Sequence, residues 1–283
     1  LAVTPADFSP YCITAPVDPR LPGGGGYQVC GLADIVPAKF GQVENLVTQA
    51  SQFIEEGADV TCDSVVGIAG RNGAACGRSD FVGVSVNARF SSGIQVGGGV
   101  DAGRTVIDRC FAVDSPQELL NCRIVMPFKA QTQIKGFASY PLPAGFTVSG
   151  TFQNLSGAAF QANYNAPNVE VASSLGRDLA ACGTRKGAAC TATALVPLIA
   201  PMTQFLDRRT QVDLRLTKSL RLGPKARLQG ILDFYNVLND STVLAVNSTF
   251  GPAWQRPTSD NSIGGVDPVL PGRLIQIGGQ FSF

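Results

Sequence analysis

Residues 211–234 read QVDLRLTKSLRLGPKARLQGILDF and combine two alternating segments with one short turn. The apolar positions are Val212, Leu214, Leu216 and Leu220 before the turn, and Leu228, Gly230, Leu232 and Phe234 after it. Polar residues stand between them, with Lys218 on the apolar side and Ile231 on the polar side as exceptions. A period of two is typical of β-strands with one apolar and one polar face. The stretch therefore predicts two such strands.

The same period returns in five other segments, at residues 81–90, 93–105, 131–140, 146–153 and 275–283. The connections alternate between short turns and long segments, which lie at about residues 108–129, 155–208 and 237–271. This alternation is typical of membrane β-barrels, whose periplasmic turns are short and whose extracellular loops are long. A soluble β-sandwich also explains the period of two, but it does not explain the unequal connections.

The predicted fold is all-β, an antiparallel transmembrane β-barrel segment of about seven strands with long extracellular loops. Residues 79–283 carry these C-terminal strands. Residues 1–78 show no sustained period and are rich in turn residues, so we expect an extracellular loop region there. Seven open strands leave two unpaired edges, which lipid does not tolerate. We therefore expect the chain to be part of a larger barrel.

The composition excludes several kinds of function. The chain has 283 residues, 22 basic and 21 acidic, and no His. Without His there is no Ser-His-Asp triad and no His-ligated metal site, and we predict neither an enzyme nor a cofactor. A net charge of +1 argues against a nucleic-acid partner. Charged residues make up 15%, below the quarter usual for soluble domains.

Aromatic residues are placed as a membrane barrel requires. If the chain ends on the periplasmic side, the predicted topology puts Phe90, Tyr140, Phe146, Phe281 and Phe283 at that rim, all on the apolar face. Membrane barrels carry such aromatic girdles at the lipid–water interface. Lys218, also on this face, lies close enough to a short turn to reach the interface.

The eight cysteines form four neighbouring couples in loop-like sequence. The couples are Cys12 and Cys30, Cys62 and Cys76, Cys110 and Cys122, and Cys182 and Cys190. None has the C-x-x-C spacing of zinc ribbons or thioredoxins. We predict local disulfides that staple long loops in an oxidising compartment; free thiols in a cytosolic protein are the alternative.

Two groups of residues are candidates for binding. The charges on the polar faces are Arg89, Asp101, Lys135, Asp213, Arg215, Arg227 and Asp233. They would line a hydrated lumen, where they either meet a ligand or pair across strands and hold the register, and we favour pairing. In the last long connection, Phe250, Trp254 and Arg256 are candidate ligand contacts, with loop packing as the favoured alternative.

The sequence also resembles a known family. The last strand, GRLIQIGGQFSF at residues 272–283, resembles the C-terminal recognition strand of bacterial outer-membrane proteins. Residues 211–254 resemble the last strands of TonB-dependent receptors, with a D-x-x-N-x-x-N segment at Asp233, Asn236 and Asn239. DPRLPGGGGYQVCGL (18–32) and FGQVENLVTQAS (40–51) resemble an extracellular loop of the Oar-like group, which usually carries an N-terminal carboxypeptidase-regulatory-like domain.

The resemblance implies a receptor of the bacterial outer membrane that binds a scarce solute and imports it with energy from TonB. Such receptors have an N-terminal plug, a TonB box and about 22 strands, whereas this chain resembles only the C-terminal part. The implied partners are outer-membrane lipid, the TonB system through the missing N-terminal part, and the barrel assembly machinery through the last strand.

Two other functions stay open. One is a complete small porin or adhesion barrel, and the other is a secreted, disulfide-stapled β-sandwich that binds a ligand. No motif decides among an iron chelate, cobalamin, a peptide and a glycan as the solute.

Overall fold

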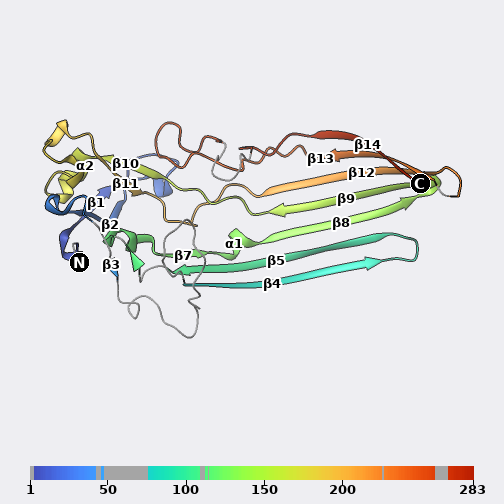
Figure 1. The fold of residues 1–283 in the computed structure, drawn as a ribbon, viewed down its shortest axis with the longest axis horizontal. Helices are drawn as coiled ribbons and strands as arrows, with labels where there is room; N and C mark the ends of the chain where they lie inside the picture. Colours follow the sequence, from blue (N-terminus) through green and yellow to red (C-terminus); the bar gives the residue numbers. More distant parts are fainter. Residues whose placement is uncertain are drawn as a thin grey trace.

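The computed structural model describes residues 3–42, 46–47, 76–108, 112–113, 115–224, 226–258 and 267–283. These residues form a mostly antiparallel β-protein with only short helices. One large sheet occupies one end of the elongated molecule, and small hairpins with a helix occupy the other (Figure 1). No helix among the described residues is both long and apolar enough to cross a membrane.

The large sheet contains seven long strands in chain order. They are β4 (Cys76–Arg89), β5 (Gln95–Asp108), β8 (Gln133–Leu142), β9 (Phe146–Leu155), β12 (Arg209–Arg221), β13 (Arg227–Tyr235) and β14 (Leu274–Ser282). Each is antiparallel to the next, and the short β7 (Arg123–Met126) also pairs with β5. All seven predicted strands are confirmed, together with their antiparallel order.

Strand pairing places the apolar positions of each strand opposite the apolar positions of its neighbours. Leu214 of β12 lies opposite Gly150 of β9 and Phe234 of β13. Phe234 in turn lies opposite Ile275 of β14. A slip of one residue would move every side chain of a strand to the other face. The register therefore collects the predicted apolar positions on one face of the whole sheet.

The connections differ in length at the two ends of the sheet. Short connections at residues 90–94, 143–145 and 222–226 lie at the end where the chain finishes (Figure 1). Gly93, Gly145 and Gly223 have φ of 86°, 76° and 90° there, a left-handed conformation that glycine adopts without steric cost. The long connections lie at the opposite end, which confirms the predicted alternation.

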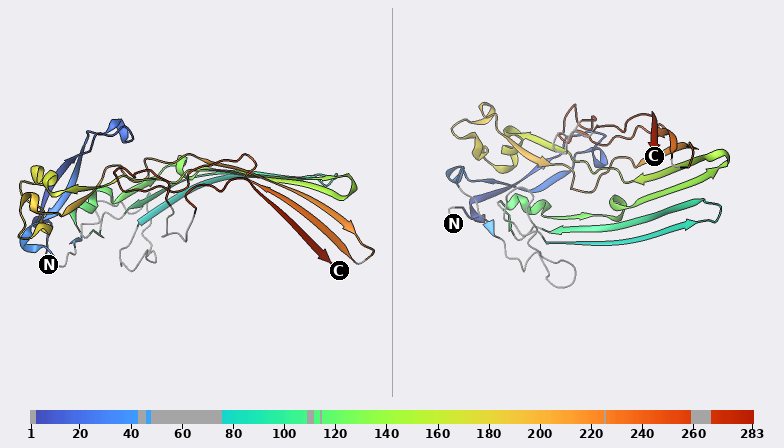
Figure 2. Two further views of the ribbon diagram at one scale, coloured as in Figure 1. Left: turned by 90° about the horizontal axis from the view of Figure 1, so that it is seen from above. Right: turned by 45° about the vertical axis from the view of Figure 1, so that its right-hand side comes forward.

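The sheet is curved and open. Seen from above, β12, β13 and β14 bend away from the plane of the earlier strands (Figure 2). In the described part of the chain, β4 and β14 are its two edges, and the sheet does not close on itself. The described residues thus agree with an antiparallel all-β chain, and they contain no closed barrel.

Small elements surround the long-connection end. They are the hairpin of β1 (Phe8–Thr14) and β2 (Gln28–Ile35), the hairpin of β10 (Asn163–Pro167) and β11 (Thr193–Pro197), the pair β3 (Leu46–Val47) and β6 (Ala112–Val113), and the helices α1 (Phe128–Gln131) and α2 (Asn168–Leu175). The main hydrophobic core lies among these elements and includes Leu32, Val171, Val196 and Trp254. We call this unit the loop-end cluster.

Within the region 1–78, which was predicted to be an extracellular loop region, residues 8–14 and 28–35 form a hairpin that the sequence did not indicate. Its register shifts between Tyr11 and Ile13, which interrupts the period of two that would have indicated strands. Turn residues in the segment between the strands masked the pattern further.

Candidate functional site

Within the described residues, one face of the large sheet is uncovered except near Val106 at the long-connection end. Val82 is 69% exposed and Ile277 is 83% exposed, although large aliphatic side chains usually lie inside. Other large apolar side chains more than a third exposed on this face are Val84, Val86, Val96, Val100, Ile134, Phe152, Leu214, Leu220, Leu228 and Ile275. The seven long strands lie about 4.8 Å apart, and roughly nine residues of each contribute to this face, so the face covers an area on the order of 800 Å². The largest apolar patch of a soluble monomer is only about 300–600 Å².

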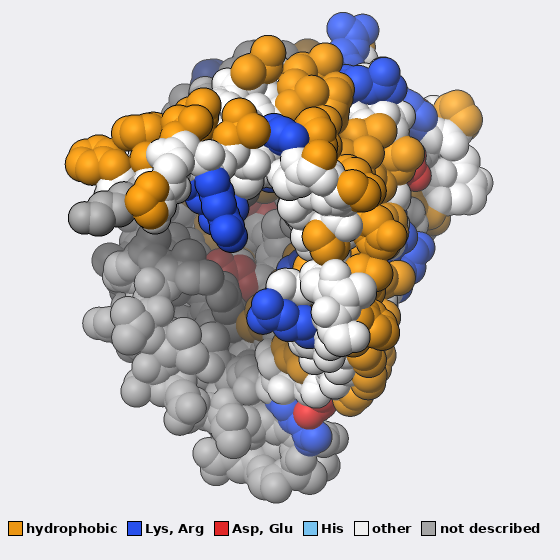
Figure 3. Space-filling model, turned by 90° about the vertical axis from the view of Figure 1, so that its right-hand side faces the viewer, with side chains coloured by type: hydrophobic (Ala, Val, Ile, Leu, Met, Phe, Trp, Pro, Cys, Tyr) orange, Lys and Arg blue, Asp and Glu red, His pale blue; other side chains and the backbone are white. Residues whose placement is uncertain are grey.

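The curvature separates the two faces of the sheet in space. Viewed from the short-connection end, hydrophobic side chains gather on the outer, convex face, and several Lys and Arg side chains project into the hollow (Figure 3). The outer face is therefore apolar, and the hollow face carries the charged side chains together with the exposed rings of Phe81 and Phe137.

Aromatic and charged groups mark the apolar face at the short-connection end. Tyr140, Phe281 and Phe283 are more than half exposed there, and the rings of Phe281 and Phe283 lie 5.8 Å apart. Lys218 Nζ donates to the Ala144 carbonyl and lies 4.1 Å from the centroid of the Phe146 ring. The cation is thus held at the margin of the face. Phe90, also predicted for this rim, is 53% exposed.

The opposite margin of the same face is polar. On β4, Arg78 Nε lies 2.8 Å from Asp80 Oδ1, and Asp80 is opposite Arg104 of β5. On β9, Asn154 Nδ2 donates to Thr210 Oγ1 of β12 at 2.7 Å. The apolar residues therefore form a band across the strands, bounded by polar groups at both ends.

The hollow face carries the seven predicted charges in register. Arg215 Nε and Nη2 donate to Asp233 Oδ1 and Oδ2 at 2.6 and 2.9 Å across β12 and β13. Asp101 lies opposite Gly83, and Lys135 lies between Gly99 and Gln153. Arg89 is opposite Gln95. The pairing of Arg215 with Asp233 agrees with the expected cross-strand role.

Asp213 does not pair with Arg227. Its carboxylate accepts from Gln211 Nε2 at 2.9 Å and from the backbone N–H of Asn236 at 2.8 Å. Arg227 instead donates to Ser219 Oγ at 2.9 Å. Register explains the difference, since Arg227 is opposite Arg221, far along β12 from Asp213.

The D-x-x-N-x-x-N segment ends β13 with two left-handed residues. Asn236 and Asn239 have φ of 49° and 54°, a conformation that Asn tolerates better than most residues. Asn236 Nδ2 donates to the carbonyls of Asp240 and Pro271, both at 2.8 Å. Asn239 Oδ1 accepts from the N–H of Arg273 at 3.1 Å. The segment thus ties the end of β13 to the chain that enters β14.

Replacing Asp233 with alanine should lower the free energy of unfolding by about 1–3 kcal/mol, because hydrogen bonds to charged groups contribute about 1.5–3 kcal/mol. The Asp233 side chain is 8% exposed and that of Arg215 is 51% exposed, so Arg215→Ala should cost less. A double-mutant cycle in the full-length protein measures the coupling. Arg227→Ala, which removes one bond to Ser219, is the control. A coupling of zero, with solute uptake lost, would assign the pair to transport instead of register.

Disulfides staple the loop-end cluster. Cys12 bonds to Cys30 and Cys182 bonds to Cys190, which confirms two of the predicted couples. Cys122 is also disulfide-bonded. Cys62, Cys110 and the side chain of Cys76 lie outside the described residues.

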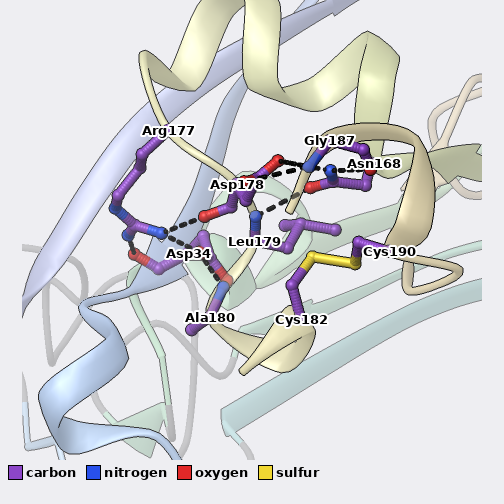
Figure 4. The surroundings of a disulfide bond; sticks show 9 residues. All are labelled: Asp34, Asn168, Arg177, Asp178, Leu179, Ala180, Cys182, Gly187 and Cys190. Atoms are coloured by element: carbon purple, nitrogen blue, oxygen red, sulfur yellow. Dashed lines mark hydrogen bonds and ion pairs between the residues drawn. A yellow bond between two sulfur atoms is a disulfide. The ribbon is translucent and has the colours of Figure 1, made fainter. Parts of the chain in front are cut away.

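Two carboxylates anchor the segment that holds Cys182 (Figure 4). Asp178 Oδ1 accepts from Asn168 Nδ2 at 2.7 Å and from the N–H of Gly187 at 3.1 Å. The bond from Asn168 is the main cause of a lowered pKa of Asp178, which keeps this carboxylate ionised. Asp34 Oδ2 accepts from Arg177 Nη1 at 2.5 Å and joins the segment to β2. No local sequence pattern indicates this network, and its contact to Asp34 joins residues 143 positions apart.

Trp254 is 1% exposed in the core of the loop-end cluster. Its Nε1 donates to the Gln161 carbonyl at 2.8 Å, and the guanidinium of Arg20 lies 5.1 Å above the ring. The Phe250 ring lies 5.2 Å away and is only partly buried, whereas Arg256 is exposed. Trp254 therefore packs the loops, which is the alternative favoured above.

The described residues contain no group of three or more Cys, Asp or Glu that could hold a metal ion. No protein-family model matches the chain. No curated protein matches it either.

Proposed function

We propose that this chain is the C-terminal part of the β-barrel of a TonB-dependent receptor in the bacterial outer membrane. The strands would span the membrane, and the loop-end cluster would face outward. The receptor would bind a scarce solute and import it with energy passed through TonB. The observation that carries the proposal is the uncovered apolar band with polar and aromatic margins.

The dimensions of the band suit a bilayer. Between Asp80 and Phe90 the strand advances about 33 Å, or about 25 Å along the membrane normal at a tilt of about 40°. The lipid-facing band of outer-membrane barrels is also about 25 Å tall. In lipid the exposed aliphatic side chains would be in their preferred surroundings, and Lys218 would reach the water interface.

The disulfides support the orientation. Disulfides persist in oxidising compartments, and both resolved bonds lie at the long-connection end. Long loops on the outer side and short turns on the periplasmic side are the arrangement of outer-membrane barrels. The hollow, with its charged and amide side chains, would then face water.

The open edges require a partner for β4 and β14. In lipid an unpaired strand edge is not tolerated. Further strands of the same barrel would therefore pair with β4 and with β14. A secreted β-sandwich would instead need a second sheet over the apolar face. The other sheets of the described residues have only two strands each, and the apolar face remains exposed.

Deleting Phe283 from the full-length protein should abolish its assembly in the outer membrane, because the deletion removes the exposed aromatic end of the last strand. Phe40→Ser is the matched control, since Phe40 is an exposed Phe outside the large sheet, 55% exposed. Membrane fractionation and detergent extraction measure the result. A monomer that is soluble without detergent, with or without Phe283, would overturn the proposal in favour of a sandwich.

Strains that lack this protein or lack TonB distinguish a TonB-dependent receptor from a porin. Mass spectrometry of spent medium should reveal a solute that wild-type cells remove and that cells lacking this protein, or lacking TonB, leave behind. Removal that needs the protein but not TonB would indicate a porin.

A further inference from the structure

A groove of about 490 Å³ lies at the base of the loop-end cluster, where the chain enters β12. Its walls are formed by residues 205–208 and 240–243, together with Phe160, Val246 and Gln255. Its volume falls within the range of about 300–1,000 Å³ that is usual for small-molecule sites. On the proposed function, which this inference presupposes, the groove would face outward, where a solute arrives.

Two aromatic residues of the groove stand on paired backbone segments. Ala159 and Phe205 form an antiparallel bridge, the N–H of Phe160 donates to the Gln204 carbonyl at 3.2 Å, and that of Leu206 to the Ala158 carbonyl at 2.9 Å. The two segments approach so closely at Gly157 that an added Cβ would lie 2.0 Å from the Leu206 carbonyl oxygen. The backbone that carries Phe160 and Phe205 is therefore held in place by these contacts.

The charged groups of the groove disfavour an anion. Arg208 is already occupied: its Nε donates to Asn154 Oδ1 at 2.7 Å and its Nη2 to the Thr132 carbonyl at 2.8 Å. Asp240 accepts from Thr242 Oγ1 at 2.7 Å, the main cause of its lowered pKa, and so stays negative. Asp207 adds an exposed carboxylate. Lys129 Nζ lies 5.9 Å from the centroid of the Phe205 ring but does not line the groove. The two carboxylates that do line it would disfavour a phosphate or an anionic chelate.

Polar groups remain for a neutral ligand. The side chains of Asp207, Ser241 and Gln255 line the groove and, within the described residues, have no side-chain hydrogen bond in the structure. Gln255 also holds a φ of 63°, a strained conformation for a non-glycine residue of the kind that gathers at binding sites. Together they offer a carboxylate, a hydroxyl and an amide beside two aromatic rings.

We propose that this groove binds a neutral, polyhydroxylated solute, such as a short oligosaccharide. The C–H face of a sugar ring would pack on Phe160 or Phe205, and its hydroxyl groups would bond to Asp207, Ser241 and Gln255. Hydroxyl groups both donate and accept, so they match the carboxylate, hydroxyl and amide together.

Isothermal titration of the full-length protein in detergent tests this, with neutral di- and trisaccharides of glucose, galactose, mannose and xylose as probes and citrate as the anionic probe. A neutral saccharide should bind and citrate should not. Phe205→Ala should weaken binding tenfold or more, and Asp207→Asn about three- to tenfold, as for lost contacts of about 0.7–1.4 kcal/mol. Phe40→Ala should leave it unchanged.

Asp207→Asn keeps the test sound if Phe205→Ala fails to fold, because Asp207 is exposed. Binding of citrate, no binding of any neutral saccharide, or an unchanged affinity in Asp207→Asn would overturn the inference. Outer-membrane assembly is measured separately. A protein that assembles but binds no saccharide contradicts the groove alone, and one that does not assemble contradicts the proposed receptor.

Discussion

Replacing Leu214 with arginine should lower the free energy of unfolding in a bilayer by about 2–4 kcal/mol, the penalty for Arg at the midplane on a lipid-facing strand. On the apolar face of β12, Leu214 lies midway between Thr210 at the polar margin and Lys218 at the other. Leu220→Arg should cost only about 0–1 kcal/mol, because it lies beyond Lys218 near the short turn. Denaturant unfolding of the full-length protein in vesicles measures both.

Leu214→Arg and Leu220→Arg place the same residue on the same face of the same strand. They differ only in how deep the new arginine would lie in the bilayer. In water they would behave alike, because Leu214 is 39% exposed and Leu220 is 44% exposed. Surface substitutions in a soluble protein usually change stability by no more than about 0.5 kcal/mol. Equal effects at the two sites would therefore contradict the lipid-facing assignment. Thr151→Arg, opposite Asp213 in the hollow, is a control for adding a charge to the other face.

The large sheet was predictable from sequence because apolar and polar residues alternate along each strand, so each strand shows which of its two faces is apolar. The stretch at 211–234 shows both faces without any knowledge of its neighbours. The phase of the pairing then follows, since a slip of one residue would remove Leu214, Phe234 and Ile275 from one common face. The paired charges Arg215 and Asp233 were predictable for the same reason.

The remaining parts depend on contacts that no local pattern records. Asp213 binds Gln211 on its own strand and the N–H of Asn236, which lies beyond the end of β13. Asn168, Asp178 and Asp34 anchor the segment of Cys182 through partners up to 146 residues away. The groove joins segments near residues 160, 205 and 240. Such convergence becomes visible only when the chain is folded.

The strands and the loop-end cluster gain stability in different ways. Among the described residues of its seven long strands, only Val106, Asp108, Thr217 and Asp233 have buried side chains, so the stability of the sheet depends on strand pairing and on whatever covers the apolar face. The cluster instead has a hydrophobic core and contains the Cys12–Cys30 and Cys182–Cys190 disulfides. The loops are therefore structured in their own right, which suits a surface that must present a fixed groove.

Replacing Trp254 with alanine should destabilise the loop-end cluster by about 3–5 kcal/mol, the usual result of truncating a large buried aromatic side chain. Trp254 contacts Phe160 and Phe250, and lies beneath Arg20, so it joins the first hairpin to the last long connection. Hydrogen exchange should show faster exchange across residues 8–35 and 163–197, and unchanged exchange in β4 and β5.

Trp254→Phe separates packing from hydrogen bonding. It keeps most of the buried ring but loses the bond from Nε1 to the Gln161 carbonyl, so it should cost about 1–3 kcal/mol. If Trp254→Ala left the exchange of the cluster unchanged and abolished solute binding, the residue would be a ligand contact and not an anchor. We expect the reverse, because a side chain 1% exposed has little surface left for a solute. Any loss of binding in Trp254→Ala would then follow from displacement of Phe160, whose ring lies 6.3 Å from Trp254 and lines the groove.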